Sequence, residues 1–193
     1  MSESNNNNPL KPNQTNAYQR PVANVYDFYL TGVIGDAEKY QDWNQVLRTA
    51  TENDGVVIHI NSNGGEIFTA IQLMRAMGDS NATICASVEG MCMSAATLIF
   101  LCADVVEVSE HSHFMLHTYS SGNWGKGSDQ LQGVLADDKW ARHLFNQVYK
   151  GFLKPIEIKE LIDGKDFWMN PSEVNKRLAA RNNAVKKTKK KEK

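Results

Sequence analysis

The sequence contains little that would support a secreted, membrane-spanning or metal-dependent protein. Its only three cysteines, Cys85, Cys92 and Cys102, lie in apolar surroundings, and their odd number favours free thiols in a reducing compartment. Their spacing, C-x6-C-x9-C, matches no common zinc pattern. No apolar run follows a basic start at the N-terminus, and the longest apolar stretch, Ala95–Ala103, is too short to span a bilayer. We therefore expect a soluble, cytoplasmic protein without a metal.

The chain also lacks a strong net charge and a nucleotide-binding loop. Its formal net charge is −1 at pH 7, but the segment 186–193 holds six Lys and one Glu, which leaves −6 for residues 1–185. An acidic body argues against nucleic-acid binding through the folded domain. The pattern G-x-x-x-x-G-K-[ST] is absent, so the chain has no P-loop for ATP. We expect no cofactor and no nucleic-acid partner for the folded domain.

Composition divides the chain into three segments. Residues 1–22 are rich in Asn and Pro and poor in apolar residues, which predicts disorder. Residues 23–180 contain nearly all of the apolar pattern and suit a single domain. The Lys-rich segment 181–193 is typical of a disordered basic tail.

Within the domain, short β-branched runs alternate with amphipathic segments. The expected strands lie near 25–30, 56–60, 83–88, 105–108 and 114–117, and the expected helices lie near 40–50, 67–74, 95–101 and 128–149. Strands that alternate with helices of about ten residues indicate βαβ units and a mainly parallel sheet. We therefore predict an α/β fold.

The last of these helices has an unusual distribution of apolar residues. Helical spacing predicts one buried stripe, formed by Leu131, Val134, Leu135, Ala141, Phe145 and Val148. Trp140 falls on the opposite side of the same helix. Because a helix that is apolar on two faces often packs against a second chain, this helix indicates an oligomer.

Two glycine-bearing turns follow two of the expected strands. They are Ser62–Gly65 and Gly90–Ser94, and ligand sites of open α/β sheets lie beyond such strand ends. Glycine lets backbone N–H groups approach a substrate closely, and N–H groups near a helix start suit a developing oxyanion. Ser94 would be exposed at a strand-to-helix turn, although a lone serine there is ordinarily a helix N-cap.

A serine nucleophile needs a base, and five histidines are available. They are His59, His111, His113, His117 and His143. On a strand that ends at residue 117, His111, His113 and His117 point to the same face, so the pattern alone leaves the choice open. No acidic or cysteine ligand motif accompanies them, so they do not indicate a metal site.

Several of these segments, taken in order, resemble the proteolytic subunit of the Clp protease, the ClpP family. Ile60–Gly65 is similar to that family's glycine-rich segment, usually written I-N-S-P-G-G, and Ser94 follows the second glycine by 29 residues, as the family's nucleophile does. Phe114–His117 resembles the strand that ends in the catalytic His, and Lys165–Met169 resembles the segment around the catalytic Asp. The resemblance covers about residues 24–178.

The resemblance implies a Ser-His-Asp triad and an oxyanion hole. Ser94 would attack the scissile carbonyl, and His117 would accept its proton and later protonate the leaving amine. Asp166 would hold the imidazole tautomer and stabilise the imidazolium. The backbone N–H groups of Gly65 and Ala95 would form the oxyanion hole. Without the resemblance, Asp166 would be interpreted as a loop acid or a helix cap.

The resemblance also implies a fold and an assembly. The fold is the ClpP/crotonase-like fold of repeated ββα units, with a mainly parallel sheet and a protruding handle helix. The assembly is a homo-oligomer of stacked heptameric rings around a chamber, fed with unfolded polypeptides by a hexameric ATPase unfoldase. The expected activity is that of an ATP-dependent, Clp-type serine endopeptidase.

The sequence departs from the family pattern beside the expected site. Asn63 replaces the usual Pro, Ala95-Ala96 replaces Met-Gly after the nucleophile, and Thr118-Tyr119 replaces Gln-Pro after the histidine. The usual Gly-Leu-Ile-Asp ending is missing, and a Lys-rich tail stands in its place. These changes mark a divergent member, of a kind that phages and prophages carry, with an altered pocket and substrate-binding strand.

Four alternatives stay open. One is a phage head-maturation or self-processing serine protease. A second is a crotonase-type acyl-CoA enzyme, which needs no Ser–His pair, and a third is a catalytically silent ring subunit, which would be expected to lose a triad member. The fourth is a peptidase of the Ser–Lys type. The presence of Ser94, His117 and Asp166 in order argues against the last three.

Overall fold

The computed structural model describes the backbone of residues 23–122 and 125–191, and side chains as far as Ala184. The segment 1–22, which we expect to be disordered, lies outside the described residues. The strands are β1 (Val25–Ile34), β2 (Gly55–Gly65), β3 (Thr83–Met93), β4 (Val105–Val108), β5 (His113–Leu116) and β6 (Phe167–Met169). The helices are α1 (Gln41–Thr49), α2 (Ile67–Asp79), α3 (Ala95–Cys102), α4 (Gly127–Val148), α5 (Pro155–Ile162) and α6 (Pro171–Lys191), with a 3-10 turn at Ala37–Tyr40.

The strands form one sheet in the order β1-β2-β3-β5-β6, with β4 also paired to β3. All pairs are parallel except β5 with β6, which is antiparallel. Up to α3 each strand is followed by a helix, and β4, β5 and α4 then form a ββα unit. The prediction of an α/β fold with a mainly parallel sheet is confirmed.

The core lies between the sheet and the helices that follow its strands. Along β2, Val56, Ile58 and Ile60 are buried, and the residues between them are not, as the two-residue period of a strand requires. Helix α3 is buried over nearly its whole surface, because it packs against α2 and the sheet together. A continuously apolar helix such as α3 therefore stabilises the domain mainly by burial.

The first three strands are longer than the sequence pattern predicted, and β1 continues to Ile34. We expected β2 to end at residue 60 and β3 at residue 88, but they continue through Gly65 and Met93. The glycines do not terminate β2, because residues 61–65 remain paired with the end of β1. This extension carries both glycine-bearing segments to the edge where the site forms.

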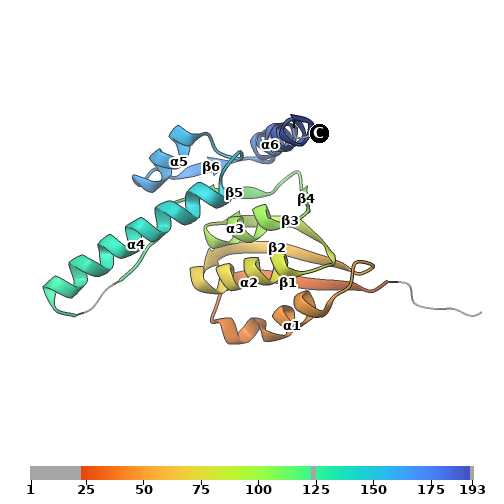
Figure 1. Cartoon of the computed structure of the whole chain (residues 1–193), viewed down its shortest axis with the longest axis horizontal. Helices are drawn as coiled ribbons and strands as arrows, with labels where there is room; N and C mark the ends of the chain where they lie inside the picture. The colour runs from red at the N-terminus through yellow and green to blue at the C-terminus, as the bar shows by residue number, and fades with distance from the viewer. Residues whose placement is uncertain (1–22, 123–124, 192–193) are drawn as a thin grey trace, which may run out of the picture.

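Helix α4 protrudes from the domain, as Figure 1 shows. Near its C-terminus Ala141 and Phe145 are buried as predicted. The prediction was wrong for Leu131, Val134 and Leu135, which are 59%, 48% and 56% exposed. The spacing of the stripe is helical, but its first half extends beyond the domain and has no partner surface within the described part of this chain.

The C-terminal segment is more regular than expected. We predicted a disordered tail from residue 181, but the backbone of α6 is helical as far as Lys191. Ala, Arg and Lys are good helix formers, and no Gly or Pro follows Pro171 to end the helix. No helix in the described ranges is long and apolar enough to cross a membrane.

Candidate active site

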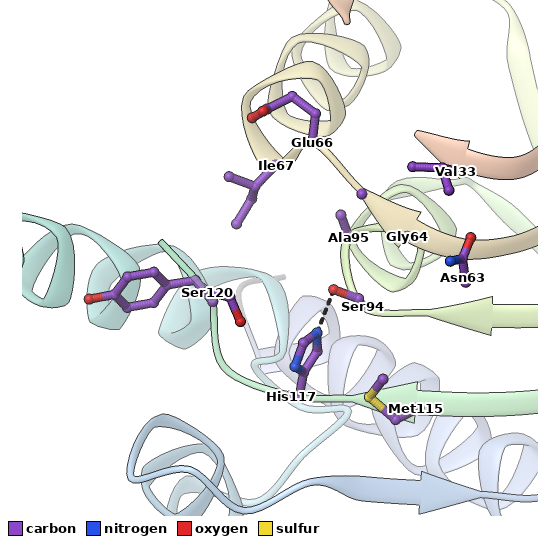
Figure 2. A pocket seen from close by; sticks show the side chains of 12 residues that line it. Val33, Asn63, Gly64, Glu66, Ile67, Ser94, Ala95, Met115, His117 and Ser120 are labelled. Atoms are coloured by element: carbon purple, nitrogen blue, oxygen red, sulfur yellow. Dashed lines mark hydrogen bonds between the residues drawn. The ribbon is translucent and has the colours of Figure 1, made fainter. Parts of the chain in front are cut away.

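The carboxyl ends of β2, β3 and β5 bring together the residues that the sequence singled out. A cleft of about 430 Å³ lies at this edge of the sheet, and its lining includes Gly65, Ser94, Ala95 and His117. Figure 2 shows the Ser94 and His117 side chains pointing toward each other from two different segments. Parallel strands end at the same edge, so the topology itself produces this meeting.

Ser94 occupies the turn between β3 and α3 in a constrained conformation. Its φ is 53° and its ψ is −127°, and it is the only non-glycine residue with positive φ in the described ranges. Its N–H donates to the Met115 carbonyl of β5 at 2.8 Å. Such backbone outliers cluster at functional sites. Although Ser94 stands at the N-cap position, its side chain makes no capping hydrogen bond, so the N-cap interpretation fails.

The Ser94 hydroxyl instead contacts His117. The distance between Ser94 Oγ and His117 Nε2 is 2.6 Å, and both residues are half-buried. His117 directly follows β5, whose backbone also holds Ser94. A neutral imidazole at this distance can accept the hydroxyl proton. The pair thus has the geometry of an activated nucleophile.

Asp166 lies one residue before β6, next to the end of the β5–β6 pair, and makes no hydrogen bond to His117 among the described side chains. In the antiparallel β5–β6 pair Leu116 faces Phe167, so the next residues along each strand are His117 and Asp166. Asp166 is exposed, and among the described side chains no hydrogen bond connects its carboxylate to the imidazole. Asp166 is not among the described residues that line the cleft, and its role stays a prediction.

Gly64 and Gly65 are required by the packing at the cleft. A Cβ added to Gly64 would lie 2.6 Å from the Ser94 Cβ and 3.0 Å from the Ala95 nitrogen. A Cβ on Gly65 would overlap the Ile34 carbonyl oxygen. Only glycine allows the β2 backbone to approach the nucleophile this closely. Gly65 and Ala95 both line the cleft together with Ser94, as residues of an oxyanion hole would.

Two polar side chains before these glycines support the turn, and we did not assign them a role from the sequence. The buried Ser62 hydroxyl donates to the Gly32 carbonyl at 2.6 Å and accepts from the Gly64 N–H at 3.1 Å. The Asn61 side-chain oxygen accepts from the Met91 N–H at 3.1 Å. Their position inside the Ile60–Gly65 segment was the only feature of the sequence that could have indicated this supporting role. These hydrogen bonds fix the segment 61–65 to β1 and β3.

The other histidines considered as bases lie outside the cleft lining. His59 contacts Asp27 at 3.1 Å and Glu89 at 2.6 Å. The hydrogen bond to Asp27, and then the one to Glu89, raise the pKa of His59. His113 packs against the Trp168 ring. No group of His, Cys, Asp and Glu in the described part of the chain could hold a metal ion.

The departures from the ClpP pattern border the same cleft. Asn63 and Tyr119 both contribute to its lining, as does Ala95. No lysine is among the described residues that line it, so a Ser–Lys mechanism has no base here. The altered residues therefore change the walls of the pocket and leave the Ser94–His117 pair in place.

Comparison with known proteins agrees with this geometry. The family model described as Clp protease matches residues 25–177, which includes every element from β1 to the first turns of α6. A search of curated proteins gave no match. Since the match covers most of the chain, the protein belongs to the Clp protease family and is a ClpP-like serine peptidase in its general class.

Proposed function

We propose that the protein is a serine endopeptidase that hydrolyses peptide bonds of unfolded polypeptides by a Ser94-His117-Asp166 triad. The observation that carries the proposal is the 2.6 Å contact between Ser94 Oγ and His117 Nε2 in a cleft bordered by two backbone segments. In the first step Ser94 Oγ attacks the scissile carbonyl carbon while its proton passes to His117 Nε2. The carbonyl oxygen becomes an oxyanion that accepts from the Gly65 and Ala95 N–H groups.

The second half of the cycle reverses these proton transfers. The protonated imidazole gives its proton to the leaving amine. The amine departs, and the acyl group remains bound to Ser94 Oγ as an ester. Water then loses a proton to His117 and attacks the ester, and the serine is regenerated. Asp166 directly precedes β6, the strand that pairs with β5. In the proposed triad its carboxylate would accept from the imidazole Nδ1–H in the working assembly and stabilise the imidazolium.

The working form is a ring-shaped homo-oligomer with its sites facing a chamber, supplied by a hexameric ATPase. The support is the exposed apolar stripe in the first half of α4, formed by Leu131, Val134 and Leu135. A second copy of the chain would cover this stripe. The sequence contains no P-loop, so we assign the coupling of ATP hydrolysis to unfolding to a separate protein. The free cysteines Cys85, Cys92 and Cys102 suit a reducing cytoplasm.

The test is fluorophosphonate labelling and peptide hydrolysis with matched serine and histidine variants. Ser94→Ala and His117→Ala should each lower peptidase activity by several orders of magnitude, because triad members act as a unit. Ser87→Ala and His113→Ala, which change the same residue types outside the cleft, should retain activity. An adduct on a serine other than Ser94, or normal activity in His117→Ala, would overturn the assignment.

A further inference from the structure

The carbonyl of the nucleophile is the end of a buried hydrogen-bond relay. The Ser94 carbonyl accepts from the Thr97 N–H at 2.9 Å and from the Thr97 hydroxyl at 2.7 Å. The Thr97 hydroxyl oxygen also lies 2.8 Å from the Tyr149 hydroxyl. Because the single Thr97 hydroxyl proton goes to the carbonyl, Tyr149 must be the donor to Thr97. The relay therefore runs from Tyr149 through Thr97 to Ser94.

Both hydroxyl groups belong to buried residues. Thr97 and Tyr149 are each 1% exposed. Tyr149 stands at the end of α4, where its N–H donates to the Phe145 carbonyl at 3.0 Å and its carbonyl accepts from Leu153 at 2.9 Å. A Thr hydroxyl that bonds an earlier carbonyl of its own helix is common. The Tyr149 donor, 52 positions away, is what fixes the Thr97 hydroxyl in this direction.

The direction of the Ser94 carbonyl sets the direction of the next N–H. A peptide unit is planar, with its C=O and N–H pointing opposite ways, so a fixed Ser94 carbonyl fixes the Ala95 N–H. The local backbone preference opposes this arrangement, because a non-glycine residue with φ near 53° is most stable with ψ near about +47°. The observed ψ of −127° differs from that value by roughly half a turn, so hydrogen bonds must hold the peptide.

We infer that Thr97 and Tyr149 are positioning residues that aim the Ala95 N–H into the oxyanion hole. The inference rests on the proposed function, since an oxyanion is what the aimed donor would bind. It assigns a role to two residues that are not among those lining the cleft and that act through the Ser94 backbone. It also connects the end of the protruding helix α4 to the nucleophile turn.

The kinetic test removes single hydroxyl groups from the full-length protein. Tyr149→Phe and Thr97→Val should each lower kcat about tenfold with little change in KM, less than the 10²–10³ that follows loss of a whole oxyanion donor. Their affinity for a peptide boronate, which mimics the tetrahedral intermediate, should fall by the same factor. Thr97→Ser, which keeps the hydroxyl, should restore both, and Thr69→Val, a buried Thr on α2, should match wild type.

A crystal structure of Tyr149→Phe separates this inference from the proposed function. We expect the Ser94–Ala95 peptide to turn away from the direction seen here, whether or not the protein hydrolyses peptides. Wild-type kcat and boronate affinity in Tyr149→Phe and Thr97→Val, with Ser94→Ala inactive, would overturn the positioning role and leave the peptidase assignment intact. An unchanged peptide direction in the Tyr149→Phe crystal would overturn it even if wild type proved inactive. An unfolding temperature equal to that of wild type in each variant would exclude loss of the fold as the cause of a lower kcat.

Discussion

Replacing Gly64 by Ala should disable the site by displacing the nucleophile. The added Cβ would lie 2.6 Å from the Ser94 Cβ, 2.7 Å from the Met93 carbonyl oxygen and 3.0 Å from the Ala95 nitrogen. Ordinary contacts of this kind are about 3.5–4.0 Å, so the Ser94 turn must move by roughly 1 Å. A displacement of about 1 Å in a positioned catalytic group lowers the rate by about 10²-fold.

The same substitution also strains the backbone, and two other glycines separate the two effects. Gly64 has φ +89°, where an L-residue costs roughly 1–2 kcal/mol. Gly32 has φ +74° with nothing within 4 Å of an added Cβ, so Gly32→Ala should show the backbone cost alone. Gly78 lies in α2 with neither strain nor contact, so Gly78→Ala should be neutral or stabilising by up to about 1 kcal/mol.

The assay is the rate of fluorophosphonate labelling of Ser94, measured with thermal unfolding of the three variants. We expect labelling to fall by about 10²-fold in Gly64→Ala only, and unfolding temperature to fall in Gly64→Ala and Gly32→Ala. Wild-type labelling by folded Gly64→Ala would show that the close approach of β2 to the nucleophile is irrelevant to the chemistry. Equal losses of labelling in Gly32→Ala would assign the effect to backbone strain.

Three further predictions concern stability, assembly and access. The hydrogen-bonded Arg177 guanidinium lowers the pKa of Glu157 to about 2. The pair should therefore add up to about 3 kcal/mol to the free energy of unfolding above pH 5, and this contribution should be lost as the pH falls toward 2. The difference in unfolding temperature between Glu157→Gln and wild type should accordingly shrink below pH 5. Leu131→Ser with Leu135→Ser should reduce the assembled mass in light scattering while monomer melting stays unchanged; an unaltered mass would remove α4 from the assembly surface. The isolated protein should cleave a short fluorogenic peptide and spare a stably folded protein, and comparable turnover of both would exclude an enclosed chamber.

The residues that repeat a local pattern were predictable, and those that depend on distant packing were not. The period of β2 and the strand-to-helix turn at Ser94 follow from neighbouring residues, so the parallel sheet and its active edge could be predicted from the sequence. The exposure of Leu131 could not, because helical spacing identifies a stripe but not where the domain beneath it ends. The pairing of Thr97 with Tyr149 was also hidden, since 52 positions separate them and neither residue type signals the other. The position of Asp166 beside the end of β5 depends on β6, a strand of three residues that is too short to recognise by its pattern.

The distribution of the site along the chain has a consequence for synthesis on the ribosome. In the proposed site, the nucleophile and both oxyanion donors belong to the segment that ends with α3, whereas His117 follows β5 and Asp166 precedes β6. A nascent chain emerges from its N-terminus, and its early elements fold first. Ser94 and its proposed oxyanion donors therefore emerge before His117, the proposed base. With His117 as the proposed base, a partly made subunit should not activate Ser94 until β5 pairs with β3, and it should therefore not attack itself or neighbouring unfolded chains.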